Sequence, residues 1–235
     1  MEKNKGWTIM FYDDPNVIKL DEEIFVYKGF FDKEYVDNIN DVMSKFNFEV
    51  FAEQDPEHAL NWYRDKLSPN LPEMLDASDK ISAFLAPEFI THPNLSLQVI
   101  KPGDGGMFIH CDSPGEGNHE QLTSTDRWST CCIITYGLVA YFGDFKGGEV
   151  FYPTLGIEYA PEPGDLVIHG AHSRTSHGVK EVTEGIRYAY SNFVMKSDRN
   201  PGSFYSYGTP EYEERKKNID LFTTPLFENP QFCKN

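Results

Sequence analysis

The second half of the chain changes in texture after Pro93, where short apolar segments alternate with turns rich in Gly, Pro, Asn and Asp. Segments of this length, separated by such residues, are typical of strands in an all-β sandwich or barrel. We expect eight strands, at 96–100, 107–111, 129–136, 148–152, 157–160, 165–169, 176–182 and 186–195. Eight strands of this length can close around a small-ligand cavity as two facing sheets. The pattern therefore predicts a mainly β protein.

The first half of the chain predicts helices that support this core. An expected strand ends at Gly29, and Asp32 is then placed as the N-cap of a helix. The apolar residues of that helix recur at helical spacing, at Tyr35, Ile39, Val42, Met43 and Phe46. A second helical pattern runs from Pro56 to about Phe89 and includes Trp62 and Tyr63. We therefore expect two amphipathic segments that each pack one face against the sheets.

One domain of 235 residues is the expected organisation, since no linker interrupts the pattern. Residues 1–95 would form the N-terminal strand and helical support, and residues 96–196 the β core. Residues 197–235 would form a C-terminal extension with a short helix near 211–218.

The charge balance limits the class of partner. The chain carries 37 acidic against 21 basic residues, a formal net charge of -16, which would repel a phosphate backbone. A nucleic-acid partner is therefore not expected, whereas the acidic surface suits a basic protein substrate or serves solubility alone. No apolar run has the length needed to cross a bilayer, and the N-terminus lacks the apolar core of a secretory signal. We expect a soluble, cytoplasmic protein without a membrane partner.

Three residues of the β-rich half could bind one metal ion. His110 and Asp112 lie two positions apart in an apolar run that reads as a strand, so both side chains project from one face. His177 follows on a predicted hairpin, ten positions before Arg187. Two imidazoles and one carboxylate on one side of an ion are the ligand set expected of non-haem Fe(II) oxygenases. His169 and His172 precede His177 and are alternatives for the third ligand.

The position of Arg187 relative to this cluster depends on the hairpin. With a turn at Glu184 and Gly185, Arg187 would pair opposite Val182, roughly 16 Å from His177 along the ribbon. We expect bending of the ribbon to bring the two ends closer.

Four motifs between about Leu97 and Val194 resemble the 2-oxoglutarate and Fe(II)-dependent dioxygenases, especially their prolyl 4-hydroxylase-like branch. They are "GGMFIHCD" with its HxD, "GDFKGGEVFYP" with GGE and FxP, "PGDLVIH" before the distal His, and "HGVKEVTEGIR" with that His and its basic residue. An HxD alone is a weak signal, but the ordered set is specific. The resemblance implies a double-stranded β-helix core of the jelly-roll or cupin-like kind.

Residue roles follow from the resemblance where residues match. It implies His110, Asp112 and His177 as iron ligands of the catalytic centre. It implies Arg187 as the partner of the distal carboxylate of 2-oxoglutarate, a role that suits a planar guanidinium, and Thr130 as a residue near this cosubstrate. The implied cofactors are Fe(II), 2-oxoglutarate and O2, with ascorbate as an additional candidate.

The implied reaction is hydroxylation of a C–H bond with release of succinate and CO2, and the leading substrate is a prolyl residue in a protein or peptide. Prolyl 4-hydroxylases usually carry Tyr where this chain has Met107, and often Lys where it has Arg187, so the substrate is less constrained than the reaction. A free amino acid or another small molecule stays open as substrate. Two further alternatives are a non-catalytic cupin-like metal- or ligand-binding protein and a zinc hydrolase, which would leave Arg187 without a role.

Overall fold

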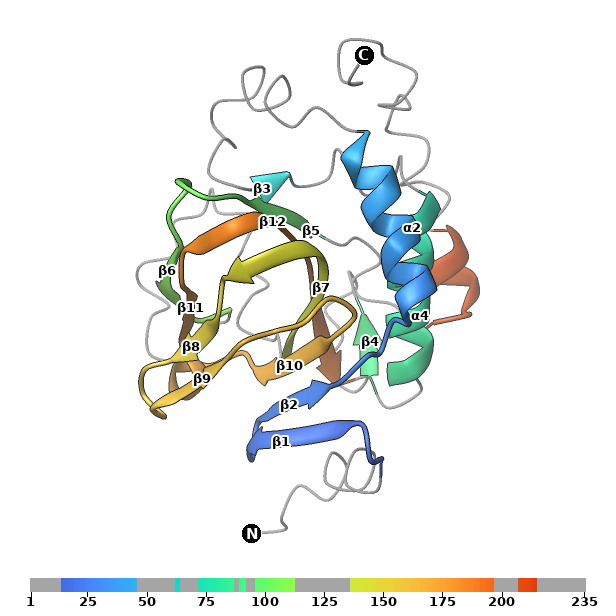
Figure 1. The fold of residues 1–235 in the computed structure, drawn as a ribbon. Coiled ribbons are helices and arrows are strands. Elements are labelled where there is room, and N and C mark those ends of the chain that lie inside the picture. The colour runs from blue at the N-terminus through green and yellow to red at the C-terminus, as the bar shows by residue number, and fades with distance from the viewer. Residues whose placement is uncertain are drawn as a thin grey trace, which may run out of the picture.

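The computed structural model of the chain describes residues 14–45, 62–63, 72–86, 89–91, 96–112, 136–196 and 207–214. Over these residues the chain forms two antiparallel sheets, with helices α2 and α4 beside the larger one (Figure 1). This is the mainly β architecture that the strand pattern predicts, and it is the double-stranded β-helix that the resemblance implies. No helix in the described part of the chain combines the length and the apolar character needed to cross a membrane.

The larger sheet has eight strands in the order β1-β2-β10-β7-β12-β5-β3, and β4 pairs with β12 beside this path. In that order the strands are β1 (Val17–Asp21), β2 (Ile24–Tyr27), β10 (Leu166–Gly170), β7 (Tyr136–Gly147), β12 (Val182–Lys196), β5 (Ser96–Ile100), β3 (Trp62–Tyr63) and β4 (Phe89–Thr91). The expected N-terminal strand is confirmed as β2, which pairs directly with β10 of the core.

The smaller sheet has four strands in the order β6-β11-β8-β9. These are β6 (Met107–His110), β11 (His177–Val179), β8 (Val150–Tyr152) and β9 (Ile157–Tyr159). A one-turn 3-10 helix, η4 (Ser173–Thr175), leads into β11. The chain then passes from the smaller sheet to the larger one between β11 and β12, where Lys180 donates a backbone hydrogen bond to Glu149.

Helix α2 (Lys33–Ser44) begins where the sequence predicts, and the Asp32 side chain accepts a hydrogen bond from the backbone N–H of Tyr35 at 2.8 Å. Phe46, the last residue of the predicted apolar stripe, lies outside the described residues. Val36, Ile39 and Met43 are the buried residues of α2. Together with residues of α4 (Pro72–Leu85), they form one apolar cluster with side chains from β5, β7, β10 and β12. The helices therefore cover one face of the larger sheet and leave the other face to the pocket between the sheets.

Two expectations about local structure were wrong. Trp62 and Tyr63 lie in strand β3, which pairs with β5, so tertiary pairing outweighs the helical spacing of their neighbours. Glu184 and Gly185 form no hairpin turn: both lie within β12, which pairs with β7. Gly185 has a φ of 72° next to a register shift, a conformation that Gly adopts without strain. The predicted strand 176–182 is thus split into β11 and the start of β12.

Strand β7 was missed beyond Tyr136, because Gly137, Gly143 and Gly147 interrupt its apolar run. Gly143 and Gly147 have φ values of 97° and 75°, so the strand bends without losing its pairing to β12. At the C-terminus a helix covers 210–214 within the described residues, and the remainder of the expected helix lies outside them. The division of the chain into residues 1–95, 96–196 and 197–235 stays a prediction.

Candidate metal centre and its pocket

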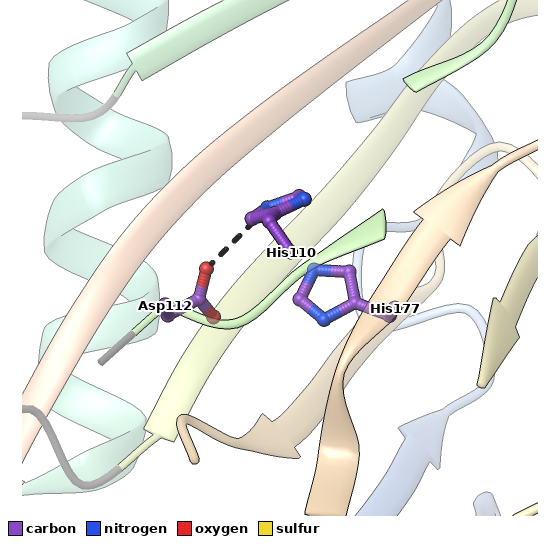
Figure 2. Close-up of side chains that lie close together, drawn as sticks. All are labelled: His110, Asp112 and His177. Carbon is purple, nitrogen blue, oxygen red and sulfur yellow. Dashed lines mark ion pairs between the residues drawn. The ribbon is translucent and has the colours of Figure 1, made fainter. Parts of the chain in front are cut away.

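Strand pairing brings the three candidate ligands together. His110 at the end of β6 and His177 at the start of β11 are directly opposed in the antiparallel register, and Asp112 follows two residues after His110. One ligand atom from each of the three lies within 4.8 Å of the other two. The His110 Nε2 and Asp112 Oδ1 atoms are 3.8 Å apart. Figure 2 shows the three side chains converging from β6, the segment after it, and β11.

Backbone carbonyl groups orient both imidazoles. His110 Nδ1 lies 3.0 Å from the carbonyl oxygen of Phe108, and His177 Nδ1 lies 3.1 Å from that of Thr175. A carbonyl oxygen can only accept, so each Nδ1 carries the donated proton and each Nε2 keeps its lone pair for a metal. Burial lowers the pKa of His177 to about 3, which keeps this imidazole neutral.

Asp112 supplies the negative charge of the cluster. Its side chain is 9% exposed, and this burial acts to raise the pKa of the carboxyl group. The hydrogen bond from His169 and the nearby imidazoles act in the opposite direction and prevail, so the pKa of Asp112 lies below its usual value. Asp112 is therefore a carboxylate near neutral pH.

The residues present fit a divalent transition-metal ion. Two imidazole nitrogens with free lone pairs and one ionised carboxylate form a three-ligand set on one side of a common point. Such a set leaves the opposite coordination positions free. Those positions would face the pocket, because all three residues belong to its lining.

The pocket lies between the two sheets and opens to solvent, and its empty space, with the adjoining solvent counted, is about 430 Å³. The same pocket is lined by the three candidate ligands and by Arg187 of β12. Much of the remaining wall is apolar, with Met107, Val139, Val150, Val179 and Phe193. The two sheets therefore place a buried guanidinium and the three candidate metal ligands in one cavity.

Arg187 is 1% exposed, and its Nε and Nη1 atoms have no hydrogen-bond partner. Its guanidinium carbon lies 4.9 Å from the centre of the Tyr141 ring, which it faces. Burial lowers the pKa of Arg187, although a guanidinium stays protonated in proteins. Buried N–H groups without acceptors are costly, so this arrangement favours an anionic ligand.

Gly148, in the GGE motif, makes room for this side chain. It has a φ of 70°, and a Cβ at this position would lie 2.9 Å from Arg187 Cδ. Gly148 therefore leaves room for the Arg187 side chain and adopts a backbone conformation that other residues rarely adopt.

Thr130, His172 and His169 are the remaining candidates from the sequence. Thr130 lies outside the described residues. His172 Nε2 lies 2.9 Å from Glu23 Oε1, and His172 is not among the described residues whose ligand atoms converge with those of His110 and Asp112. His169 contacts Asp112, and Tyr141 contacts Arg187, and the sequence reasoning missed both contacts. Each contact joins residues from different strands, so no spacing within the sequence indicates it.

The sequence matches no protein-family model, and no curated protein matches it. Solved structures do match. A viral collagen prolyl hydroxylase from Paramecium bursaria Chlorella virus-1, in complex with 2-oxoglutarate, aligns with a TM-score of 0.52 at 16% identity, over 74% of this chain and 96% of the viral one. A truncated form of that protein aligns with the same TM-score at 14% identity, over 74% and 90% of the two chains.

A prolyl 4-hydroxylase structure from Phytophthora capsici also has a TM-score of 0.52, at 18% identity, over 77% of this chain and 61% of that one. At these identities the likeness concerns the fold. The chain thus has the double-stranded β-helix fold of prolyl hydroxylases.

Proposed function

We propose that this chain, which has the fold of prolyl hydroxylases, is an Fe(II)- and 2-oxoglutarate-dependent dioxygenase that hydroxylates a C–H bond. One observation carries the proposal: a single pocket joins three convergent metal-ligating side chains to a buried guanidinium with unpaired N–H groups. A metal-binding protein needs no such cation behind the ion, and a zinc hydrolase would leave it unused.

The iron would be held by the Nε2 atoms of His110 and His177 and by a carboxylate oxygen of Asp112. Bound iron with 2-oxoglutarate and O2 supplies oxidative decarboxylation, which yields succinate and CO2 and oxidises the substrate C–H bond to an alcohol. The protein then has to orient the cosubstrate and exclude water.

Arg187 would bind the distal carboxylate of 2-oxoglutarate through charge-assisted hydrogen bonds from its unpaired nitrogens. The Tyr141 ring packs against the guanidinium and holds it within the cavity. The apolar wall that includes Val150 and Val179 would keep water from the reacting groups. Each of these contributions comes from a residue that the fold already buries.

The proposed substrate class is a prolyl residue in a protein or peptide. The supporting observation is that the structural neighbours named above are prolyl hydroxylases, one of them named for collagen. A free amino acid or another small molecule is the alternative substrate, and ascorbate the expected reductant that maintains Fe(II).

The test follows succinate formation by the purified chain with Fe(II), ascorbate, 2-oxoglutarate and O2. We expect slow turnover without a prime substrate, its loss in His177→Ala, and its retention in His172→Ala, whose side chain pairs with Glu23 outside the cluster. Turnover unchanged by His177→Ala would refute the assigned centre. Mass spectrometry of proline-containing peptides should then show the gain of one oxygen on proline, and a gain only on free amino acids would favour the alternative substrate.

A further inference from the structure

A further histidine, His169 on β10, contacts the candidate ligand Asp112. Its Nε2 lies 3.0 Å from Asp112 Oδ2, while the other carboxylate oxygen, Oδ1, is the one near His110 Nε2, at 3.8 Å. His169 is 1% exposed, and its ring centre lies 4.0 Å from that of His177. The two oxygens of Asp112 therefore have different neighbours.

Tyr152 on β8 contacts the other ring nitrogen of His169, Nδ1. Its hydroxyl lies 2.9 Å from His169 Nδ1, and the residue is fully buried. A carboxylate can only accept, so Nε2 donates to Asp112, and in the neutral imidazole Nδ1 then accepts from the Tyr152 O–H. Burial raises the pKa of Tyr152 well above its usual value, so the hydroxyl keeps its proton. The hydrogen bonds thus run in one direction, from Tyr152 through His169 to Asp112.

Gly137 on β7 provides the space for this pair. It is the direct pairing partner of His169 in the sheet. A Cβ at position 137 would lie 2.1 Å from Asp112 Oδ2 and 2.6 Å from His169 Nε2. Any side chain here would therefore displace the carboxylate or the imidazole.

We propose that His169, backed by Tyr152 and given room by Gly137, is a positioning residue that binds Oδ2 of Asp112 so that Oδ1 alone faces the metal. A carboxylate held through one oxygen occupies a single coordination position, whereas a rotated carboxylate could occupy two. Three positions then stay open for the two donor atoms of 2-oxoglutarate and for O2. The inference rests on the metal centre of the proposed function and adds a residue to it.

Metal affinity, measured without turnover, tests this role. Titration of the full chain with Mn(II) under anaerobic conditions and without 2-oxoglutarate gives a dissociation constant for each variant, and thermal unfolding of the metal-free protein shows that it is folded. We expect His169→Phe to weaken Mn(II) binding about 10- to 100-fold, the usual effect of removing a hydrogen-bond partner of a metal ligand.

Two further variants distinguish a hydrogen-bonding role of His169 from a role in packing alone. His169→Gln can place an amide N–H near the position of Nε2 and is expected to restore Mn(II) affinity to within about threefold of the original chain. His172→Phe makes the same change as His169→Phe at a residue that pairs with Glu23, and it should leave the affinity unchanged. Weak binding in His169→Gln equal to that of His169→Phe would contradict the hydrogen-bonding role.

Tyr152→Phe removes only a hydroxyl, so it keeps the inference testable if His169→Phe does not fold. We expect a loss of about threefold or more in Mn(II) affinity, because Nδ1 of the buried His169 then loses its hydrogen-bond donor and the imidazole is held less firmly against Asp112. Unchanged affinity in both His169→Phe and Tyr152→Phe would overturn the inference. Complete loss of binding in His169→Phe, equal to that of His110→Ala, would also overturn it and make His169 a ligand.

These outcomes are distinct from failure of the proposed function. If the original chain binds Mn(II) and His169→Phe weakens binding, but no succinate forms, the positioning role stands and the oxygenase proposal fails. If the original chain binds neither Mn(II) nor Fe(II), both fail.

Discussion

Replacing Arg187 by Met should leave the ligand-free chain as stable as before or more stable, but it should weaken the binding of 2-oxoglutarate. The guanidinium is buried, and two of its nitrogens lack partners. An unsatisfied buried donor costs about 1–3 kcal/mol, and Met fills a similar volume without polar atoms. We therefore expect Arg187→Met to leave the free energy of unfolding of the ligand-free chain unchanged or to raise it by about 1 kcal/mol, equivalent to about 2–4 °C in Tm.

In the presence of 2-oxoglutarate the Arg187→Met variant should be less stable than the original chain. Removing one member of a buried, hydrogen-bonded charge pair costs about 2–5 kcal/mol, so the dissociation constant of 2-oxoglutarate should rise about 30-fold or more. At a concentration 100 times the original dissociation constant, the ligand stabilises the original chain by about 2.7 kcal/mol and the variant by less than about 1 kcal/mol.

Thermal unfolding with Mn(II) in place of iron, with and without 2-oxoglutarate, measures both effects without turnover. Arg174→Met is the matched control, because Arg174 is half-exposed and bonds Asp21 and Glu23 outside the pocket. This control should respond to 2-oxoglutarate like the original chain. The reasoning is refuted if Arg187→Met keeps the full ligand-induced shift, or if it loses Mn(II) affinity as strongly as 2-oxoglutarate affinity.

Three further changes test the surroundings of the site. Gly148→Ala should weaken 2-oxoglutarate binding several-fold and destabilise the chain by about 1 kcal/mol or more, measured by calorimetry, because its Cβ would lie 2.9 Å from Arg187 Cδ at a φ of 70°. Asn40→Ala should lower the free energy of unfolding in urea by about 1–3 kcal/mol, because its side chain accepts from the Gly143 N–H at 2.8 Å and joins α2 to β7. For Asp21, a hydrogen bond from a guanidinium holds the pKa below its usual value, so its stabilisation is present above about pH 4 and is lost as the pH falls below it. The stability difference between the original chain and Asp21→Asn should therefore shrink towards pH 3, and a difference independent of pH would contradict this.

Sequence periodicity was informative wherever structure depends on neighbouring residues. The strand Ser96–Ile100 and the helix that begins after Asp32 formed where expected, because side-chain alternation and N-capping act within a few residues. The spacing of His110 and Asp112 likewise indicated a shared face. The two-residue strand at Trp62–Tyr63 was mispredicted, because its conformation depends on pairing with β5.

The sequence by itself determined the strand-rich class of the core, and it predicted the candidate metal ligands His110, Asp112 and His177 and the accompanying Arg187. Only the tertiary structure decided that His177 opposes His110 in one sheet while Arg187 reaches the same pocket from the other. It also decided that His169 contacts Asp112 in the space that Gly137 leaves free. The physical reason is that alternation along a strand is local, whereas the pairing of distant strands depends on how the whole chain buries its apolar faces.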